Sequence, residues 1–156
     1  MINVSALIGD LGPSQKSFYL IKAFNELSRN PNLSCTAFVL KISPPYTKPL
    51  FSCSSVSFLS NYNGVCLATN LEEAQILLKS NNNSKKYLYL WDMEWIKRPM
   101  NYSQVCDILL DDRLSIISRS DSHSCMIENY CNKPPIATIQ DWNPSQILEI
   151  LEKTHA

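Results

Sequence analysis

The sequence predicts an α/β fold, and three observations carry that prediction. Short apolar runs recur along the chain, the first at 3–8 and the last at 136–139. Between them lie segments with apolar residues at helical spacing, such as Phe18, Ile21 and Phe24. The length of 156 residues suits one domain with its own core. Because strands that alternate with helices form a mostly parallel sheet covered on both faces, we expect a single Rossmann-like three-layer domain with about six strands.

The first 40 residues predict a strand, a turn, a helix and a second strand. The apolar run at 3–8 ends at Gly9, and the turn is expected to extend to Ser14. The helix starts from Ser17 and stops before Pro31, which disfavours helix at the residue before it. With a strand at 35–40, the opening is a βαβ unit.

The remaining elements are expected at shorter intervals. Residues 41–61 contain three prolines and six serines, which predicts an irregular segment with one short strand at 56–59. Asn70 and Asn143 are typical helix caps, and Pro144 suits the first helical position. Further strands are expected at 65–68, 87–91, 114–117 and 136–139, a loop at 99–103, and helices near 105–109 and 126–130.

Composition excludes several classes of protein. The chain is 45% hydrophobic, and its 14 basic and 14 acidic residues cancel, which argues against disorder and against general nucleic-acid binding. Its apolar stretches are too short to span a membrane, and no basic segment precedes the first one, so we expect a cytoplasmic protein. The six cysteines form no C-x-x-C pair, so we expect reduced thiols that pack as small hydrophobes, Cys53 excepted, and no metal or cofactor.

Two stretches together resemble the carboxy-terminal, nucleotide-sugar-binding domain of GT-B glycosyltransferases. The first reads LIGDLGPSQK at 7–16 and LIKAFNEL at 20–27, similar to that family's strand, glycine turn and helix. The second reads SRSDSHSCMIENY at 118–130 and KPPIA at 133–137, similar to its loop, helix and following strand.

The resemblance implies binding of a nucleotide or nucleotide-sugar and, in an active enzyme, metal-independent sugar transfer. A loop that leads into a helix offers free backbone amides to a diphosphate, and Glu128 is placed to accept hydrogen bonds from ribose hydroxyls. His123 is the candidate catalytic residue, as a general base or as a donor to the sugar. The binding residues implied are Gly9, Gly12, Lys16, Arg119, Ser120, Asp121, Ser122, Ser124 and Glu128.

The sequence also departs from the family pattern. Asp10 replaces a basic residue of the turn, serines replace loop glycines, and Asp121 and Glu128 are seven residues apart where the family has two glutamates eight apart. One domain forms only one wall of a GT-B cleft, so we expect a homo-oligomer or a second chain, with contacts through 46–59 or 91–95. The alternative is a non-catalytic binding or assembly subunit derived from a glycosyltransferase. A flavodoxin-like or receiver-like domain is disfavoured, because the turn after the first strand lacks the residues that these proteins use.

Two further patterns admit a functional and a structural interpretation. Asp92 and Glu94, two residues apart, could hold Mg²⁺ or Mn²⁺, although a polar strand end is the simpler interpretation. Tyr87, Tyr89 and Trp91 lie among basic residues that include Lys97 and Arg98, a pattern that can stack nucleic-acid bases. Because these aromatics alternate, we expect them to pack on one face of a strand.

Overall fold

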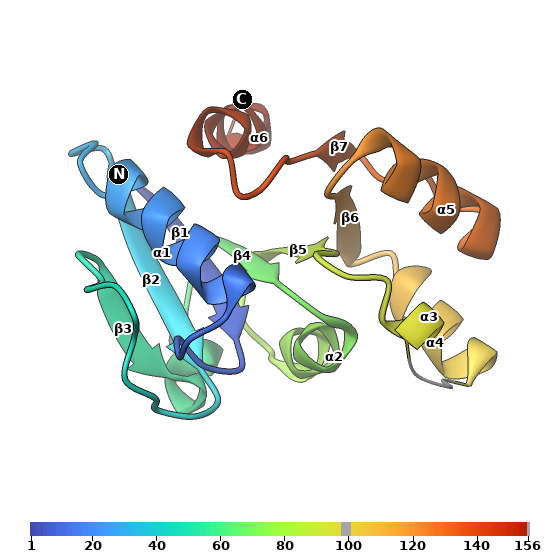
Figure 1. Cartoon of the computed structure of the whole chain (residues 1–156), viewed down its shortest axis with the longest axis horizontal. Coiled ribbons are helices and arrows are strands. Elements are labelled where there is room, and N and C mark those ends of the chain that lie inside the picture. The colour runs from blue at the N-terminus through green and yellow to red at the C-terminus, as the bar shows by residue number, and fades with distance from the viewer. Residues whose placement is uncertain (98–100, 156) are drawn as a thin grey trace.

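The protein folds around one sheet of seven parallel strands (Figure 1). The computed structural model describes residues 1–97 and 101–155. The strand order is β3-β2-β1-β4-β5-β6-β7. The expected parallel α/β sheet is therefore confirmed, with every strand pair parallel. The strands are β1 (Ile2–Ile8), β2 (Leu33–Val39), β3 (Ser52–Ser55), β4 (Val65–Ala68), β5 (Lys85–Tyr89), β6 (Leu114–Ser118) and β7 (Ala137–Thr138).

Helices cover both faces of this sheet, which gives the three layers of a Rossmann-like domain. One face packs against α1 and α6, and the other against α2, α4, α5 and a 3₁₀ helix, η1 (Figure 1). The helices are α1 (Gln15–Leu27), η1 (Val56–Asn61), α2 (Leu71–Lys79), α3 (Glu94–Lys97), α4 (Tyr102–Leu109), α5 (Asp121–Cys131) and α6 (Pro144–His155). No helix in the described ranges is long and apolar enough to cross a membrane.

The aromatic residues in and just after β5 show how the alternating pattern builds this core. Tyr87, Tyr89 and Trp91 are at most 7% exposed and belong to the core on the α1 side of the sheet. Leu88 and Leu90, between them, belong to the core on the α2 side. The packing interpretation of the aromatic run is confirmed, and these three rings are not available to stack on bases.

Two predicted helix starts are confirmed by their caps, whereas α1 begins at Gln15 and not from Ser17, and α5 begins at Asp121, well before the helix expected near 126–130. The Asn70 side chain accepts a hydrogen bond from the Glu73 amide, and the Asn143 side chain accepts one from the Ser145 amide. Gln146 reaches back, although its side chain accepts from the amide of Gln140 and not from the cap residue.

Several predictions between the regular elements are wrong. The strand expected at 56–59 is the helix η1, and the edge strand β3 precedes it. Helix α4 begins inside the loop expected at 99–103, of which residues 99 and 100, like Arg98, lie outside the described residues. All six cysteines are free, but Cys125 is exposed and does not pack as expected.

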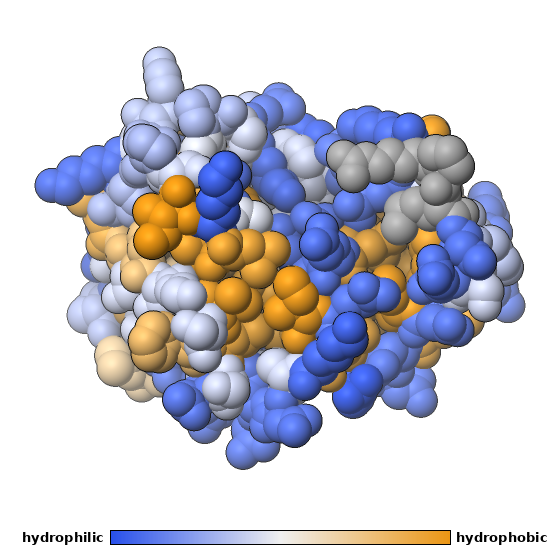
Figure 2. Space-filling view, turned by 90° about the horizontal axis from the view of Figure 1, so that it is seen from below, coloured by the Kyte–Doolittle hydropathy of each residue, from blue (hydrophilic) through white to orange (hydrophobic). Residues whose placement is uncertain are grey.

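The two segments expected to contact another chain, 46–59 and 91–95, differ in exposure. Tyr46, Leu50 and Phe58 are exposed, whereas Trp91 is buried. Hydrophobic surface runs across the middle of the face seen from below, among polar residues (Figure 2).

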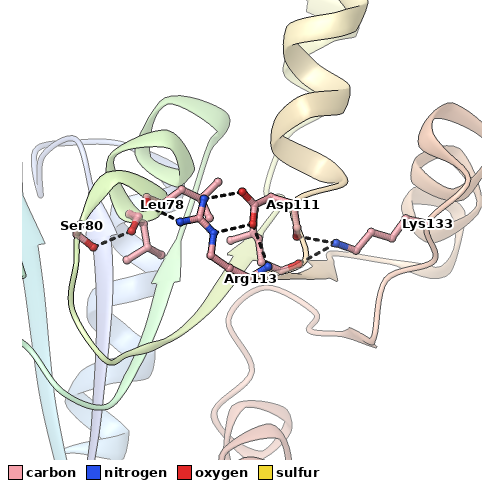
Figure 3. Close-up of polar contacts among 7 residues, drawn as sticks. Leu78, Ser80, Asp111, Arg113 and Lys133 are labelled. Atoms are coloured by element: carbon pink, nitrogen blue, oxygen red, sulfur yellow. Dashed lines mark hydrogen bonds and ion pairs between the residues drawn. The ribbon is translucent and has the colours of Figure 1, made fainter.

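At the amino edge of the sheet, charged side chains tie the loops to the strands. Arg113 pairs with Asp111 and donates to the carbonyl of Leu78 at the end of α2, while Lys133 donates to the carbonyls of Asp111 and Leu114 (Figure 3). The Arg113 guanidinium lowers the pKa of the Asp111 carboxyl. These contacts hold the end of α2 and the segment after α5 against the start of β6.

Candidate functional site

Two polar pockets open at the carboxyl edge of the sheet, where open α/β sheets bind ligands. The larger, the β6–β7 pocket, has a volume of about 570 Å³. The other, the switch-point pocket, has a volume of about 430 Å³ and lies between the ends of β1 and β4, where the strand order reverses. The β6–β7 pocket is lined by Arg119, Ser120, Asp121, His123, Thr138, Gln140, Asp141 and Gln146.

The N-terminus of α5 forms one wall of the β6–β7 pocket. Ser120 caps the helix, because its side chain accepts from the amide of His123 and its carbonyl accepts from the amide of Ser124. Within the described part of the chain, the amides of Asp121 and Ser122 donate to no protein acceptor. Free amides at the positive end of an 11-residue helix favour an anionic ligand.

Arg119 is held in the β6–β7 pocket by two contacts. Its Nε and Nη2 donate to Asp141 Oδ1 at 3.0 and 2.8 Å, and its guanidinium carbon lies 3.7 Å from the ring centroid of Trp91. The backbone around Asp141 is equally constrained, since Asp141 and Trp142 both have positive φ and the Trp142 ring is fully buried against Tyr89. The guanidinium is therefore preoriented, and a carboxylate already balances its charge.

The polar side chains of α5 divide between the pocket and the sheet. The His123 ring lines the pocket, and its Nδ1 is buried with no hydrogen-bond partner among the residues described. The Ser124 hydroxyl instead joins Ser118 and Thr138 in a cluster with Oγ–Oγ distances of 2.5 Å to Ser118 and 3.4 Å to Thr138. This serine occupies space where the resembled family has a glycine, and its side chain stabilises the end of β6.

Two other predicted binding residues lie outside the lining of the β6–β7 pocket. Ser122 and Glu128 are exposed on α5, with Glu128 seven residues beyond Asp121. At 1.5 Å per residue, that places it roughly 10 Å further along the helix axis. Only a ligand that extends along α5 can contact Glu128 and the helix N-terminus together.

The switch-point pocket contains the other predicted residues, namely Gly9, Gly12 and Lys16. The amide of Gly12 donates to Asp10 Oδ1 at 2.7 Å, so the aspartate closes the turn from within. A side chain at Gly12 would meet that carboxylate oxygen at 2.8 Å and Ser43 at 3.3 Å, so Asp10 would have to move to admit it. Gly9 has no such constraint, because a Cβ there meets its nearest atom, Glu73 Oε1, at 3.8 Å.

Lys16 is part of a chain of hydrogen bonds that leads to a buried acid. Its Nζ donates to Thr69 Oγ1 at 3.0 Å, and the amide and hydroxyl of Thr69 both contact Glu73 Oε2, at 2.8 and 2.5 Å. Glu73 is fully buried, and this burial raises the pKa of its carboxyl against the opposing effects of Lys16 and Thr69. Lys16 thus balances a buried carboxylate and is not an unengaged cation.

Aromatic contacts connect the two pockets. Tyr19, one turn after Lys16 on α1, lies 5.8 Å from Trp91 between ring centroids, and Trp91 carries Arg119 on its ring. Tyr19, Trp91 and Arg119 therefore form a continuous run of contacts on the α1 side of the sheet.

The Asp92–Glu94 pair is engaged by the protein itself. Glu94 Oε2 accepts from the amide of Leu71 at 2.7 Å and so caps α2, while Asp92 forms an ion pair with Lys97 at 3.0 Å. In the described ranges no three His, Cys, Asp or Glu side chains converge. These contacts account for both carboxylates structurally.

Three important residues were not among the sequence predictions. Asp141 is 22 residues from Arg119, Thr69 is 53 residues from Lys16, and no local pattern links either pair. The burial of Glu73 was partly indicated by the sequence, because it lies between Leu71 and Ala74, two residues of the buried face of α2.

The fold and the carboxyl-edge pockets define a Rossmann-like α/β protein with a preoriented arginine at a helix N-terminus. No protein-family model matches the chain, and neither a curated protein nor a solved structure matches it.

Proposed function

We propose that the protein binds a nucleotide or nucleotide-sugar at the carboxyl edge of its sheet, as a glycosyltransferase-like domain of the GT-B type. One observation carries the proposal. The β6–β7 pocket combines the free amides of α5 with the preoriented guanidinium of Arg119. Backbone amides at a helix N-terminus and a planar guanidinium are both donors suited to phosphate oxygens.

Six of the predicted residues have a role in this proposal. The diphosphate lies at the N-terminus of α5, with the amides of Asp121 and Ser122 and the free Nη1 of Arg119 as donors. Glu128 accepts hydrogen bonds from the ribose hydroxyls of a nucleoside that extends along α5. Lys16 contacts the distal part of the ligand, and His123 is the candidate base or donor near the sugar. Because amides and side chains balance the phosphate charge, binding requires no metal ion.

The pocket's own charges favour a second candidate, a non-catalytic binding or assembly subunit. Asp141 already occupies two donors of Arg119, and Asp121 adds a second carboxylate. Asp10 likewise occupies the Gly12 amide in the turn where an active enzyme would receive phosphate. Carboxylates in these positions weaken binding of a doubly charged phosphate group.

Calorimetric titration tests the proposal directly. UDP, GDP, ADP and their sugar conjugates are titrated into the protein and into the Arg119→Gln variant. Arg29→Gln, which removes an exposed arginine in the turn after α1, is the matched control. Binding that weakens roughly 10- to 150-fold in Arg119→Gln alone supports the site, because a hydrogen bond to a charged group contributes about 1.5–3 kcal/mol.

The same samples separate the two candidate functions. Release of free nucleotide from a nucleotide-sugar, in the presence of a suitable acceptor, supports the enzyme, whereas binding without turnover supports the non-catalytic subunit. No heat of binding with any nucleotide at millimolar concentration contradicts the enzyme and favours the non-catalytic assembly subunit.

A further inference from the structure

A third pocket, of about 280 Å³, lies at the ends of β2 and β3, beside the switch-point pocket. Leu11 and Val39, both buried, belong to its lining, together with the exposed Ile42 and two prolines, Pro45 and Pro49. Its character is apolar, in contrast to the two polar pockets on the same edge.

This apolar pocket adjoins the switch-point pocket at Ser43. Ser43 lines both, and the turn at Gly12 lies against Ser43, with a Cβ built at Gly12 3.3 Å from the Ser43 Cβ. Lys16 and Asp10 stand on the polar side of this junction, and Ile42 stands on the apolar side. The junction therefore joins a hydrogen-bonding compartment to a hydrophobic one.

The loop that walls the apolar pocket is anchored at both ends. At its start, the amide of Lys41 donates to the carbonyl of Gly9 at 2.9 Å. Near its end, the Asn25 side chain accepts from the amide of Leu50 at 2.6 Å and donates to the carbonyl of Lys48 at 3.1 Å. Three prolines restrict the backbone between these anchors. The pocket is consequently preformed and does not require a ligand to shape it.

Ile42 at the mouth of this pocket is 90% exposed, although it adjoins buried apolar residues. An apolar group that enters here removes hydrophobic surface from water, and each buried methylene increases affinity about fourfold. The polar compartment next to it contains Lys16, whose Nζ already donates to Thr69, and Asp10, whose Oδ1 already accepts from the Gly12 amide. The remaining donors of this cation and acceptors of this anion together suit uncharged hydroxyl groups better than a phosphate.

We propose that the two adjoining pockets bind an amphipathic ligand, with a hydroxyl-rich head in the switch-point pocket and an apolar tail in the pocket between Leu11, Ile42 and Cys53. The identification of this ligand as the glycosyl acceptor rests on the proposed function, whereas the binding site itself does not. The acceptor class is then a sugar or polyol that carries a short alkyl or aromatic group.

Cys53 provides a reporter for the apolar pocket, because it lines that pocket and is exposed. Cys125 is the other exposed cysteine, and the remaining four are buried. In a Cys125→Ser background, the rate of modification by a small thiol reagent therefore reports the accessibility of Cys53. Octyl glucoside, below its critical micelle concentration, is the probe, and methyl glucoside is the control with the same head and no tail.

Bound octyl glucoside is expected to protect Cys53. At ten times its Kd the modification rate falls about elevenfold, by mass action, while methyl glucoside at equal concentration has no such effect. Hexyl glucoside, which is two methylenes shorter, binds about 15-fold more weakly. The variant Ile42→Asp loses protection, and Ile136→Asp, which changes an equally apolar exposed residue before β7, retains it.

Three results overturn the proposal: no protection by octyl glucoside, equal protection by methyl glucoside, or protection unchanged in Ile42→Asp. A modification rate that falls with protein concentration in the absence of any probe also overturns it, because a second copy of the chain then covers the pocket. Protection by octyl glucoside in a protein that binds no nucleotide supports the site and contradicts only the acceptor assignment.

Discussion

The carboxylate that holds Arg119 is expected to weaken nucleotide binding, so its neutralisation should strengthen it. In the parent protein, Nε and Nη2 of Arg119 lie 3.0 and 2.8 Å from Asp141 Oδ1. In Asp141→Asn the side-chain oxygen can still accept both of these hydrogen bonds. Asn also tolerates the left-handed backbone at this position, where φ is 46°. The substitution therefore removes one negative charge with the guanidinium still in place over Trp91.

The size of the effect follows from Coulomb's law. A phosphate on the free side of the guanidinium lies about 6 Å from the position of Asp141 Oδ1, where one unit of repulsion amounts to about 0.7 kcal/mol in a water-like medium and about 2.8 kcal/mol at an effective dielectric constant of 20. Arg119 and Asp141 are both partly exposed, which favours the lower half of this range. We expect UDP, or whichever nucleotide binds, to bind about 3- to 20-fold more tightly.

The assay is calorimetric titration of Asp141→Asn against the parent at low and high salt. Asp112→Asn, an exposed carboxylate before β6 at the opposite edge, gives the same change in net charge and should leave affinity unchanged. The gain in affinity should shrink as salt screens the interaction. Unchanged or weaker binding in Asp141→Asn, with a normal melting temperature, would refute the placement of phosphate beside Arg119.

Three other outcomes are expected. Glu128→Ala should weaken nucleotide binding roughly 10- to 150-fold with little change in Tm, because the side chain is exposed; equal affinity removes Glu128 from the site. EDTA should leave nucleotide binding unchanged. If binding instead requires Mn²⁺ and is lost in Asp92→Asn, the interpretation of Asp92 and Glu94 as a metal site is supported. Burial raises the pKa of Glu73, so the folded state keeps this proton to higher pH than the unfolded state, and the free energy of unfolding should fall as pH rises through that interval. Glu73→Gln should remove that fall, as measured by urea denaturation between about pH 4 and pH 8; a parallel profile in the variant would contradict this role.

The regular part of the fold could be predicted from the sequence because local patterns determine it. Alternation at Tyr87, Tyr89 and Trp91 marks a strand that is buried on both faces, and the cap residues Asn70 and Asn143 mark helix starts. The edge strand β3 could not be predicted, because its sequence SCSS is exposed and carries no apolar alternation. Its pairing with β2 supplies the strand geometry that local propensity does not.

The candidate site was only partly predictable, for a similar reason. The residues around the start of α5 are adjacent in sequence, so Arg119, Ser120 and Asp121 are recognisable as one group. Their partners are not local, since Asp141 contacts Arg119 from the loop after β7. Asp141 has a positive φ there and is followed by Trp142, whose ring is fully buried. Charge balance in the pockets is a tertiary property, which no spacing rule reveals.

The central claim is that a nucleotide binds at the β6–β7 pocket, and amide chemical-shift mapping tests it most directly. In ¹H–¹⁵N spectra of the full chain titrated with UDP, GDP or ADP, we expect shifts at residues 119–124 and 138–141 for at least one nucleotide. Residues 111–114, at the amino edge that Figure 3 shows, should stay unchanged. Shifts confined to other residues, or none at millimolar nucleotide, would contradict the account.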